Sequence, residues 1–360
     1  MSKTPCRVLS IQSHVAFGYV GGKAAVFPLQ CLGFDVDVVN TVNFSNHTGY
    51  GRFGGSRTTA EELSEIFCAL EENGLLRPSR LLTGYIAGAL ALSTVASLAS
   101  RLRQRDLTLI YVLDPVLGDA GKLYVSPECI PIYQSMLPLA TVITPNWFEV
   151  ETLTKIEMTD LASLKRALRV LHEEYRVPNV IISSMILKPW LKEILPENIR
   201  PVQSLDDQSD HLLCLCSASH NIDNTSDLSV IHAHAVSCLP GYFSGVGDLF
   251  SAMVLAHLQP TVHPSVLQQL GADQTPLSYA ASMAVTKTHA VLSLTHEYAQ
   301  NLSEDERLPT DDEKDKLDPE RKIRRMRGRE LRLVQGQDII RSVDLTNCRR
   351  MEKWSNFWSS

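Results

Sequence analysis

The sequence lacks the features of a secreted or membrane-spanning protein. Its eight cysteines include no Cys-x-x-Cys pair, and no secretory signal precedes them. No apolar run approaches the roughly 20 residues that a membrane-spanning helix needs. We therefore expect a cytoplasmic protein without a membrane partner, in which the cysteines act as small buried apolar side chains.

A net positive charge is also missing. The formal net charge is -6 at pH 7, and the basic residues gather only in the run RKIRRMRGR at 321–329. A chain with this balance has no general attraction for nucleic-acid phosphates, so we expect no nucleic-acid partner. The 360 residues, 44% of them hydrophobic and 21% charged, have the composition of an ordinary globular protein with a large core.

Two glycine-rich runs lack the context of known nucleotide-binding loops. GYGRFG at 49–54 has Gly-x-Gly-x-x-Gly spacing, but SNHT separates it from the preceding strand and GSRTT from the next helix. GYVGGKAA at 18–25 lacks P-loop spacing and has Ala24 in place of the metal-binding hydroxyl. These contexts argue against a dinucleotide-binding enzyme and against a Walker-type NTPase.

Two cysteines and two histidines come nearest to a metal-binding pattern. They are Cys214 and Cys216 in LLCLC, and His232 and His234 in IHAHAV. Alternation places both thiols on one face of a strand. We favour a strand whose thiols fill the core, with a zinc site as the alternative.

Short β-rich runs alternate with longer runs that have helical spacing of apolar residues. The expected strands lie at 7–13, 34–42, 80–85, 107–115, 140–146 and 177–184, and the expected helices at 59–73, 91–105 and 160–175. Several strands are almost wholly apolar, which is typical of a sheet that helices cover on both faces. The sequence predicts an α/β fold, a three-layer α/β/α sandwich with a mostly parallel central sheet.

The rest of the chain is less regular. Residues 185–240 predict exposed turns around the LLCLC strand, and 302–329 is a charged insertion, acidic first and basic after. We expect this insertion to be a solvated loop or mobile helix, with an interaction segment as the alternative. ELRLVQ at 330–335 predicts a strand that returns to the fold, so we expect one domain over 1–345 and a C-terminal tail over 346–360.

Polar residues follow several of the expected strands. Ligands of open α/β sheets bind at the carboxyl ends of the strands, so these residues are the first candidates for chemistry. Each of them also has a structural interpretation, because strands end in turns and Asp, Asn, Ser and Pro favour turns, so none is persuasive alone. They are Ser13, residues 40–43, Thr83, Tyr85, Asp114, Thr144, Asn146, Ser183 and Ser184.

The run SGVGDLFSAMVLAH at 244–257 places two glycines and Asp248 at the start of an apolar helix. Glycines allow a ligand to approach the backbone, and the first N–H groups of a helix bind negative charge. Asp248 can cap the helix, but a carboxylate repels a bound phosphate, so capping alone explains the run poorly. A kinase needs both parts, because amides stabilise the transferred phosphoryl group and a carboxylate receives the proton of the acceptor hydroxyl.

GVGD resembles the GTGD or GAGD signature of the ribokinase-like sugar and vitamin kinases. Within that superfamily the chain resembles the pyridoxal kinases, over most of residues 6–300. The matching runs are 7–51, LLTGY at 81–85, YVLDPVLGD with GKLYV at 111–125, ITPNWFEVETLT at 143–154 and GVGDLFSAMVLAH at 245–257. The resemblance implies a homodimer with a ribokinase-like fold that phosphorylates the 5′-hydroxymethyl group of pyridoxal, pyridoxine or pyridoxamine with ATP and Mg²⁺.

The resemblance also implies roles for individual residues. Asp248 matches the catalytic base, and the amides of Gly245, Val246 and Gly247 match the anion hole. The residues matched to the metal are Asp119, Thr144 and Glu149, with a monovalent cation such as K⁺ near Asp114 and Thr144. The residues matched to ATP are Asp114, Tyr124, Asn146, Glu149, Ser183, Ser184, Gly245 and Gly247. The residues matched to the pyridine ring are Ser13 and Thr48 by hydrogen bonds, and Val42, Phe44 and Tyr85 by packing.

Two positions depart from the pattern. Val246 replaces the usual Thr or Ala, so a hydroxyl contact to phosphate worth about 1.5–3 kcal/mol is lost. Asn43 stands where many relatives have Gln. Two alternatives stay open. One is a kinase for a related heterocycle such as hydroxymethylpyrimidine, because the phosphate motifs do not identify the ring. The other is a weakly active vitamin-binding homologue, which Val246 and the irregular region 185–240 suggest.

Overall fold

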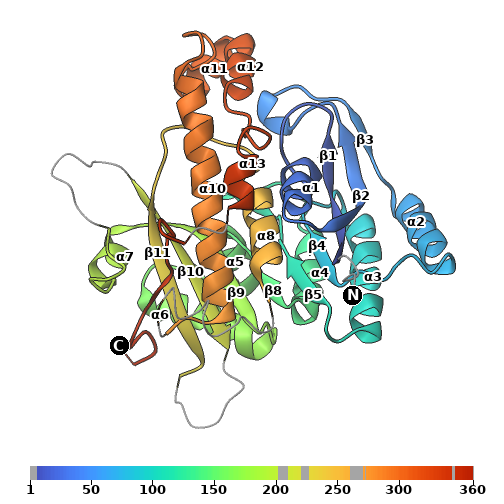
Figure 1. The fold of residues 1–360 in the computed structure, drawn as a ribbon, viewed down its shortest axis with the longest axis horizontal. Helices are drawn as coiled ribbons and strands as arrows, with labels where there is room; N and C mark the ends of the chain where they lie inside the picture. Colours follow the sequence, from blue (N-terminus) through green and yellow to red (C-terminus); the bar gives the residue numbers. More distant parts are fainter. Residues whose placement is uncertain are drawn as a thin grey trace.

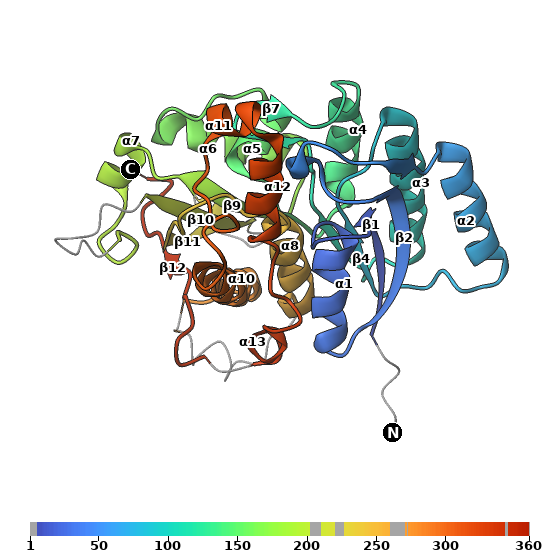
Figure 2. The same cartoon turned by 90° about the horizontal axis from the view of Figure 1, so that it is seen from above.

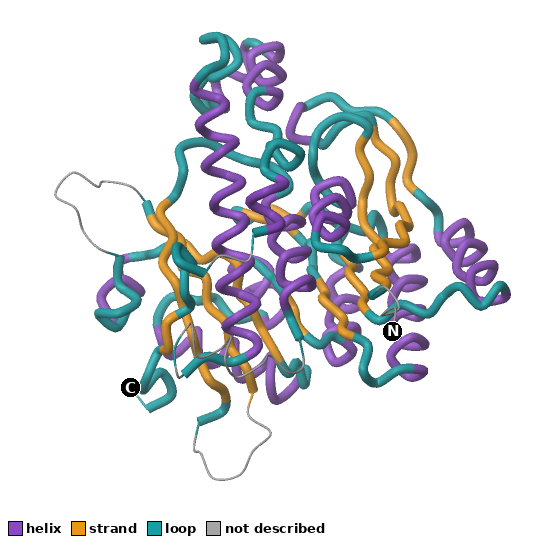
Figure 3. The backbone as a smooth tube through the Cα atoms, viewed as in Figure 1, coloured by secondary structure: helices purple, strands orange, loops and turns teal. Residues whose placement is uncertain are grey.

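A ten-stranded sheet runs through the computed structural model, which describes residues 6–201, 210–219, 227–259, 271, 273–342 and 345–359 (Figures 1 and 3). The strands in sheet order are β12 (Glu352–Lys353), β11 (Ser229–Ser237), β10 (His211–Ser219), β9 (Asn179–Ile186), β8 (Val142–Ile143), β5 (Ile110–Leu113), β4 (Arg80–Thr83), β1 (Arg7–Val15), β2 (Asp35–Phe44) and β3 (Gly55–Arg57). A hairpin of β6 (Gly118–Asp119) and β7 (Lys122–Leu123) lies outside this sheet.

The central strands are parallel, as predicted. β2, β1, β4, β5, β8 and β9 run in one direction, with Val8 opposite Val36 and Leu81 opposite Tyr111. β10, β11 and β12 extend one end of the sheet as antiparallel neighbours, and β3 ends the other. Because β11 is antiparallel to β10, which is antiparallel to β9, β11 again runs with the parallel strands.

Helices cover both faces of the sheet (Figure 2). One face carries α2 (Ala60–Glu72), α3 (Ala89–Arg105), α4 (Cys129–Met136), α5 (Trp147–Thr154), and α6 (Leu161–Arg169), which continues as a π-helix over Val170–Glu174. The other face carries α1 (Gly22–Cys31), α8 (Val246–His257), α10 (Pro276–Gln300) and α13 (Gln337–Arg341). The other described helices are η1 (Thr48–Tyr50), η2 (Leu137–Leu139), α7 (Pro189–Ile194), α11 (Asp312–Leu317) and α12 (Pro319–Arg327).

The apolar strands fill two cores, one on each face. Val8 and Leu82 belong to one cluster, while Leu9 and Leu81 belong to the other, because successive side chains of a strand point to opposite faces. This arrangement confirms the predicted three-layer α/β/α sandwich. None of the described helices is long and apolar enough to cross a membrane.

The cysteines of the LLCLC run fill the core, as favoured from the sequence. Cys214 and Cys216 are buried in the cluster beneath α8 and α10. The histidines opposite them bind backbone carbonyls: His232 Nε2 lies 2.9 Å from Asp273 O, and His234 Nδ1 lies 2.8 Å from Arg350 O.

The strand predicted at 330–335 is wrong. Leu331 and Leu333 are buried, which explains the alternating pattern, but residues 333–336 form a turn. Arg332 N donates to Thr295 Oγ1 at 3.0 Å, so this segment binds α10 and not the sheet.

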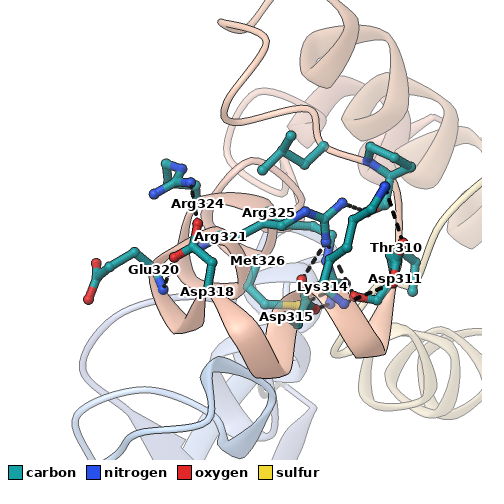
Figure 4. A network of polar contacts seen from close by, with 12 residues as sticks. Thr310, Asp311, Lys314, Asp315, Asp318, Glu320, Arg321, Arg324, Arg325 and Met326 are labelled. Carbon is teal, nitrogen blue, oxygen red and sulfur yellow. Dashed lines mark hydrogen bonds and ion pairs between the residues drawn. The ribbon is translucent and has the colours of Figure 1, made fainter.

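The charged insertion at 302–329 is not a wholly solvated segment, contrary to expectation. It contains α11 and α12, and both helices contribute to a buried ion cluster (Figure 4). Asp315 of α11 pairs with Arg321 and Arg325 of α12, and all three residues are buried. The acidic first part and the basic second part of this insertion therefore pair with each other, through two helices.

The C-terminal residues pack on the sheet. Lys353 of β12 pairs with His232 of β11, and Trp354 N donates to Ile231 O at 2.9 Å. Trp354 and Phe357 are buried in one of the two cores.

Candidate active site

The start of α8 lies at the carboxyl edge of the parallel strands, because the chain reaches it from β11, which runs in the same direction as they do. Gly245 has a left-handed conformation with φ +79°, and an added Cβ would clash with Tyr19 O. Leu249 N donates to Gly245 O at 3.1 Å, so the N–H groups of Val246, Gly247 and Asp248 belong to the first helical turn. Among the described residues, no side chain caps this helix, and a Cβ on Gly247 would meet no atom within 4 Å. The geometry leaves room for an anion at these amides.

Asp248 does not cap its own helix. Its Oδ2 accepts a hydrogen bond of 2.7 Å from Gly21 N, in the loop between β1 and α1. Gly21 in turn lies against Ser13, because an added Cβ would clash with the Ser13 hydroxyl. Burial raises the pKa of Asp248, and the Gly21 N–H offsets part of that rise. The structure thus brings the predicted base close to a predicted ring-binding residue.

A buried polar chain lies one turn further along α8. Ser251 Oγ donates to Asp114 Oδ2 at 3.0 Å and lies 2.8 Å from Thr144 Oγ1. Burial, followed by the charges of Glu149 and Asp248, raises the pKa of Asp114 well above its usual range. Ser251 was not among the residues predicted from the sequence, because an apolar run surrounds it. Its position three residues after Asp248, on the same helix face, is the signal that would have found it.

The Asn-x-x-Glu pair caps α5 and binds the chain before β6. Glu149 Oε2 accepts from Asn146 N at 2.8 Å, while Asn146 Oδ1 accepts from Glu149 N at 2.9 Å. Glu149 Oε1 accepts from Leu117 N at 3.0 Å, and Asn146 Nδ2 donates to Gly118 O at 2.8 Å. Burial raises the pKa of Glu149; the backbone N–H groups lower it, and the charge of Asp119 raises it.

Asp119 ends β6 in a tight hairpin. Ala120 and Gly121 have φ of +48° and +80°, and Asp119 Oδ1 accepts from Ala120 N at 2.7 Å. Tyr124, which follows β7, is half exposed and hydrogen-bonds Tyr242 in the loop before Gly245. Burial, with the nearby Tyr242 and Asp119, raises the pKa of Tyr124.

The two predicted serines of β9 lie at its junction with β8. Ser183 N donates to Pro145 O at 2.9 Å, one residue after Thr144. Ser184 is half-buried. Both roles near ATP stay predictions.

The donor set suits a hard cation that shares its coordination with other ligands. In the described part of the chain, no three His, Cys, Asp or Glu side chains converge closely enough to hold a metal alone. Asp114, Glu149 and Asp248 nevertheless have raised pKa values, and the first is raised partly by the other two. Such crowding of carboxylates favours a cation, and a divalent ion that keeps water and phosphate ligands needs few protein oxygens.

The predicted ring-packing residues form one apolar cluster. Val42 and Phe44 of β2 are buried with Val15 of β1, and Tyr85 packs against them. Thr41 Oγ1 donates to Tyr85 O at 2.7 Å, which fixes the segment after β4. Thr48 is exposed at the first position of η1, and its ring contact stays a prediction.

Known proteins are similar to this chain in both sequence and fold. A family model described as phosphomethylpyrimidine kinase matches residues 82–196. The chain is 35% identical to the pyridoxal kinase of Arabidopsis thaliana over 93% of this chain and 91% of that one. It is also 35% identical to the pyridoxal kinase of Homo sapiens, over 82% of this chain and 87% of that one.

A solved structure agrees. The pyridoxal kinase of Leishmania donovani in complex with ADP and pyridoxine superimposes with a TM-score of 0.73 at 29% identity, over 97% of this chain and 99% of that one. The chain belongs to the pyridoxal kinase family. It is therefore an ATP-dependent kinase of B6 vitamers with a ribokinase-like fold, and the family resemblance drawn from the sequence is confirmed.

Proposed function

We propose that this member of the pyridoxal kinase family transfers the γ-phosphoryl group of ATP to the 5′-hydroxymethyl group of pyridoxal, and that pyridoxine and pyridoxamine are also substrates. One observation carries the residue assignment. Asp248, with its raised pKa, stands in the first turn of α8 beside backbone amides that no side chain caps. A base and an anion site thus occupy the same helical turn.

Asp248 receives the proton of the acceptor hydroxyl in this mechanism. An alcohol is too weak an acid to ionise beforehand, so the proton passes to the carboxylate as the new P–O bond forms. Burial makes the carboxylate a stronger base than an exposed aspartate. The amides of Val246 and Gly247 stabilise the charge on the phosphoryl group in flight.

Asp119 and Glu149 would hold Mg²⁺, with Asn146 contributing through water. Held by these residues, Mg²⁺ would supply positive charge that offsets the negative charge of the phosphates. Asp114 and Thr144 would lie beside a monovalent cation such as K⁺, since Ser251 already links their oxygens. Tyr124, Ser183 and Ser184 would line the path of ATP. The raised pKa values of Asp114 and Glu149 support cation binding at this end of the site.

The acceptor ring would lie against the cluster of Val42, Phe44 and Tyr85. Ser13 and Thr48 would hydrogen-bond its polar atoms. The proximity of Ser13 to Gly21, which binds Asp248, supports this placement, because the ring must present its hydroxymethyl group to the base.

A homodimer in the cytoplasm is the form that the family resemblance implies. None of the eight cysteines forms a disulfide, which supports a reducing compartment. Analytical ultracentrifugation of the purified protein would test the dimer: a monomer at micromolar concentration would contradict it.

Product formation with the purified protein tests the substrate assignment. We expect phosphorylation of pyridoxal with ATP, Mg²⁺ and K⁺, and slower turnover of hydroxymethylpyrimidine. The match of residues 82–196 to a phosphomethylpyrimidine kinase model makes hydroxymethylpyrimidine the informative competitor. A preference for it would favour the related-heterocycle kinase, and vitamer binding without turnover would favour a weakly active vitamin-binding protein.

A further inference from the structure

Glu330 is a buried carboxylate that joins two loops distant in sequence. Its Oε2 accepts from Tyr19 N at 2.8 Å, and its Oε1 accepts from Tyr50 Oη at 2.7 Å. His47 Nε2 lies 3.2 Å from the same Oε1. Burial alone would raise the pKa of Glu330, but the hydrogen bonds from His47 and Tyr50 outweigh it, so the pKa is lowered and the group stays ionised.

The first loop bound by Glu330 connects β1 to α1 and positions the phosphate side of the site. Gly18 has φ +88°, and a Cβ there would clash with the Glu330 carboxylate. Tyr19 O lies where a Cβ on Gly245 would stand, so Tyr19 packs directly against the anion loop. Two residues on, Gly21 N donates to Asp248. A shift of Tyr19 would therefore move both the base and the amides.

The second loop belongs to the acceptor side. His47 precedes η1 and Tyr50 is its last residue, while its first residue is the proposed ring-binding Thr48. Their rings lie 4.7 Å apart, centroid to centroid, and Tyr50 also meets Phe17 of the first loop edge-on at 6.1 Å. Glu330 thus lies where the two loops meet.

Helices α11 and α12 support this junction from outside. Met326 of α12 is buried, and its Cε lies 3.0 Å from the Cβ position of Gly49. In Figure 1, α12 lies at the top of the molecule, at the level of the carboxyl ends of β1 and β2. The ion cluster of Asp315, Arg321 and Arg325 ties α12 to α11 just before the chain reaches Glu330.

From these contacts we propose that Glu330 is a positioning residue. It holds the acceptor loop, residues 47–50, against the loop after β1, which contacts the base Asp248 and the anion-binding turn at Gly245. It touches no reacting atom. This inference rests on the proposed function, because it assigns the two loops to the acceptor and to the phosphoryl group.

Two conservative variants test the proposal. Glu330→Gln keeps the side-chain size but turns an amide NH₂ toward backbone or side-chain donors, and Tyr50→Phe removes one hydroxyl while keeping the ring contacts. Loss of a hydrogen bond to a charged group predicts that kcat/KM for pyridoxal falls on the order of tenfold in each. Because the ATP contacts proposed at Asp114, Tyr124 and Glu149 lie elsewhere, KM for ATP should stay within about twofold.

Coupling between the two variants gives a second readout. Since both remove one shared interaction, Tyr50→Phe should have little effect in the Glu330→Gln background. Glu320→Gln is the matched control, because Glu320 is exposed in α12 and its side chain, within the described part of the chain, pairs with Arg52 alone, at 3.9 Å. It should leave both KM values unchanged.

The outcomes separate this inference from the function. Equal increases in KM for ATP and for pyridoxal, or additive effects of the two variants on kcat/KM, would overturn the positioning role. The thermal unfolding midpoint shows whether each variant is folded. Absence of pyridoxal phosphorylation by the wild type would refute the proposed function instead. In that case pyridoxal binding, measured by its absorbance change without ATP, still tests Glu330: unchanged affinity in Glu330→Gln would reject the inference.

Discussion

Asp248 Oδ2 accepts a hydrogen bond of 2.7 Å from the backbone N–H of Gly21, a residue 227 positions earlier in the chain. This bond joins the first turn of α8 to the loop after β1. It holds the proposed base by a backbone group, so the orientation of the carboxylate does not depend on the rotamer of a second side chain. The arrangement favours a fixed base at the phosphate end of the acceptor site.

Replacing Asp248 should remove proton transfer to this side chain while both substrates still bind. We expect Asp248→Asn to lower kcat by roughly 10²–10⁴-fold, because an amide cannot take the proton. In the wild type, kcat/KM should fall toward acid with an apparent pKa above 3.8, since burial raises the pKa of this group. The acid limb should be absent from the residual activity of Asp248→Asn. Near wild-type turnover by that variant would show that another group is the base.

The buried carboxylates predict a link between pH and cation binding. The pKa values of Asp114 and Glu149 are raised in the folded protein, so the folded state retains protons that the unfolded state releases. Without a cation, the free energy of unfolding should therefore fall as pH rises above about 4, by up to about 1.4 kcal/mol per pH unit for each proton retained, until the folded pKa is passed.

Mg²⁺ should reverse this effect by binding the ionised groups. We expect MgCl₂ to raise the unfolding midpoint more at pH 8 than at pH 6, as measured by differential scanning calorimetry. In Glu149→Gln, the rise of the unfolding midpoint with MgCl₂ should be nearly the same at pH 8 and at pH 6. Glu320→Gln, which changes an exposed side chain, should keep the larger rise at pH 8. Equal stabilisation at both pH values would show that Mg²⁺ does not bind these carboxylates.

Val246 is the departure most open to repair. It is the first residue of α8, between the two glycines, and its side chain is half-buried. Val246→Thr keeps the β-branched shape and restores a hydroxyl, so we expect kcat to rise by roughly ten- to hundredfold if that hydroxyl binds phosphate. Steady-state rates with saturating ATP measure this. An unchanged rate would mean that the backbone amides suffice and that the valine costs the enzyme nothing.

The sequence predicted the features that depend on neighbouring residues in the chain, such as the central strands and the start of α8. The parallel strands were visible because burial on both faces makes them continuous apolar runs, and Asp248 was visible because its glycines precede an apolar helix. Ser251 and Glu330 were missed, since their roles come from contacts with residues far away in the chain. The wrong strand at 330–335 has the same origin: alternating Leu331 and Leu333 are buried against helices and not within a sheet. Likewise, the charges at 302–329 reveal nothing of their partners until two helices pair them.

Gly245 and Gly247 form a matched pair that tests the anion loop. Gly245 has φ +79°, and an added Cβ would clash with Tyr19 O, so Gly245→Ala combines backbone strain with a shift of Tyr19. Gly247 has no atom within 4 Å of its Cβ position. We expect Gly245→Ala to lower the free energy of unfolding by at least about 1–3 kcal/mol, whereas Gly247→Ala leaves stability unchanged.

The kinetic effects of the pair should differ from the stability effects. A methyl group on Gly247 would enter the space in which the phosphoryl group is proposed to lie, so Gly247→Ala should lower kcat although the protein remains stable. Urea unfolding and steady-state rates, measured on the same preparations, separate the two effects. Full activity of Gly247→Ala would place the phosphoryl group away from this turn and would remove the anion-hole assignment, whatever the outcome for Asp248.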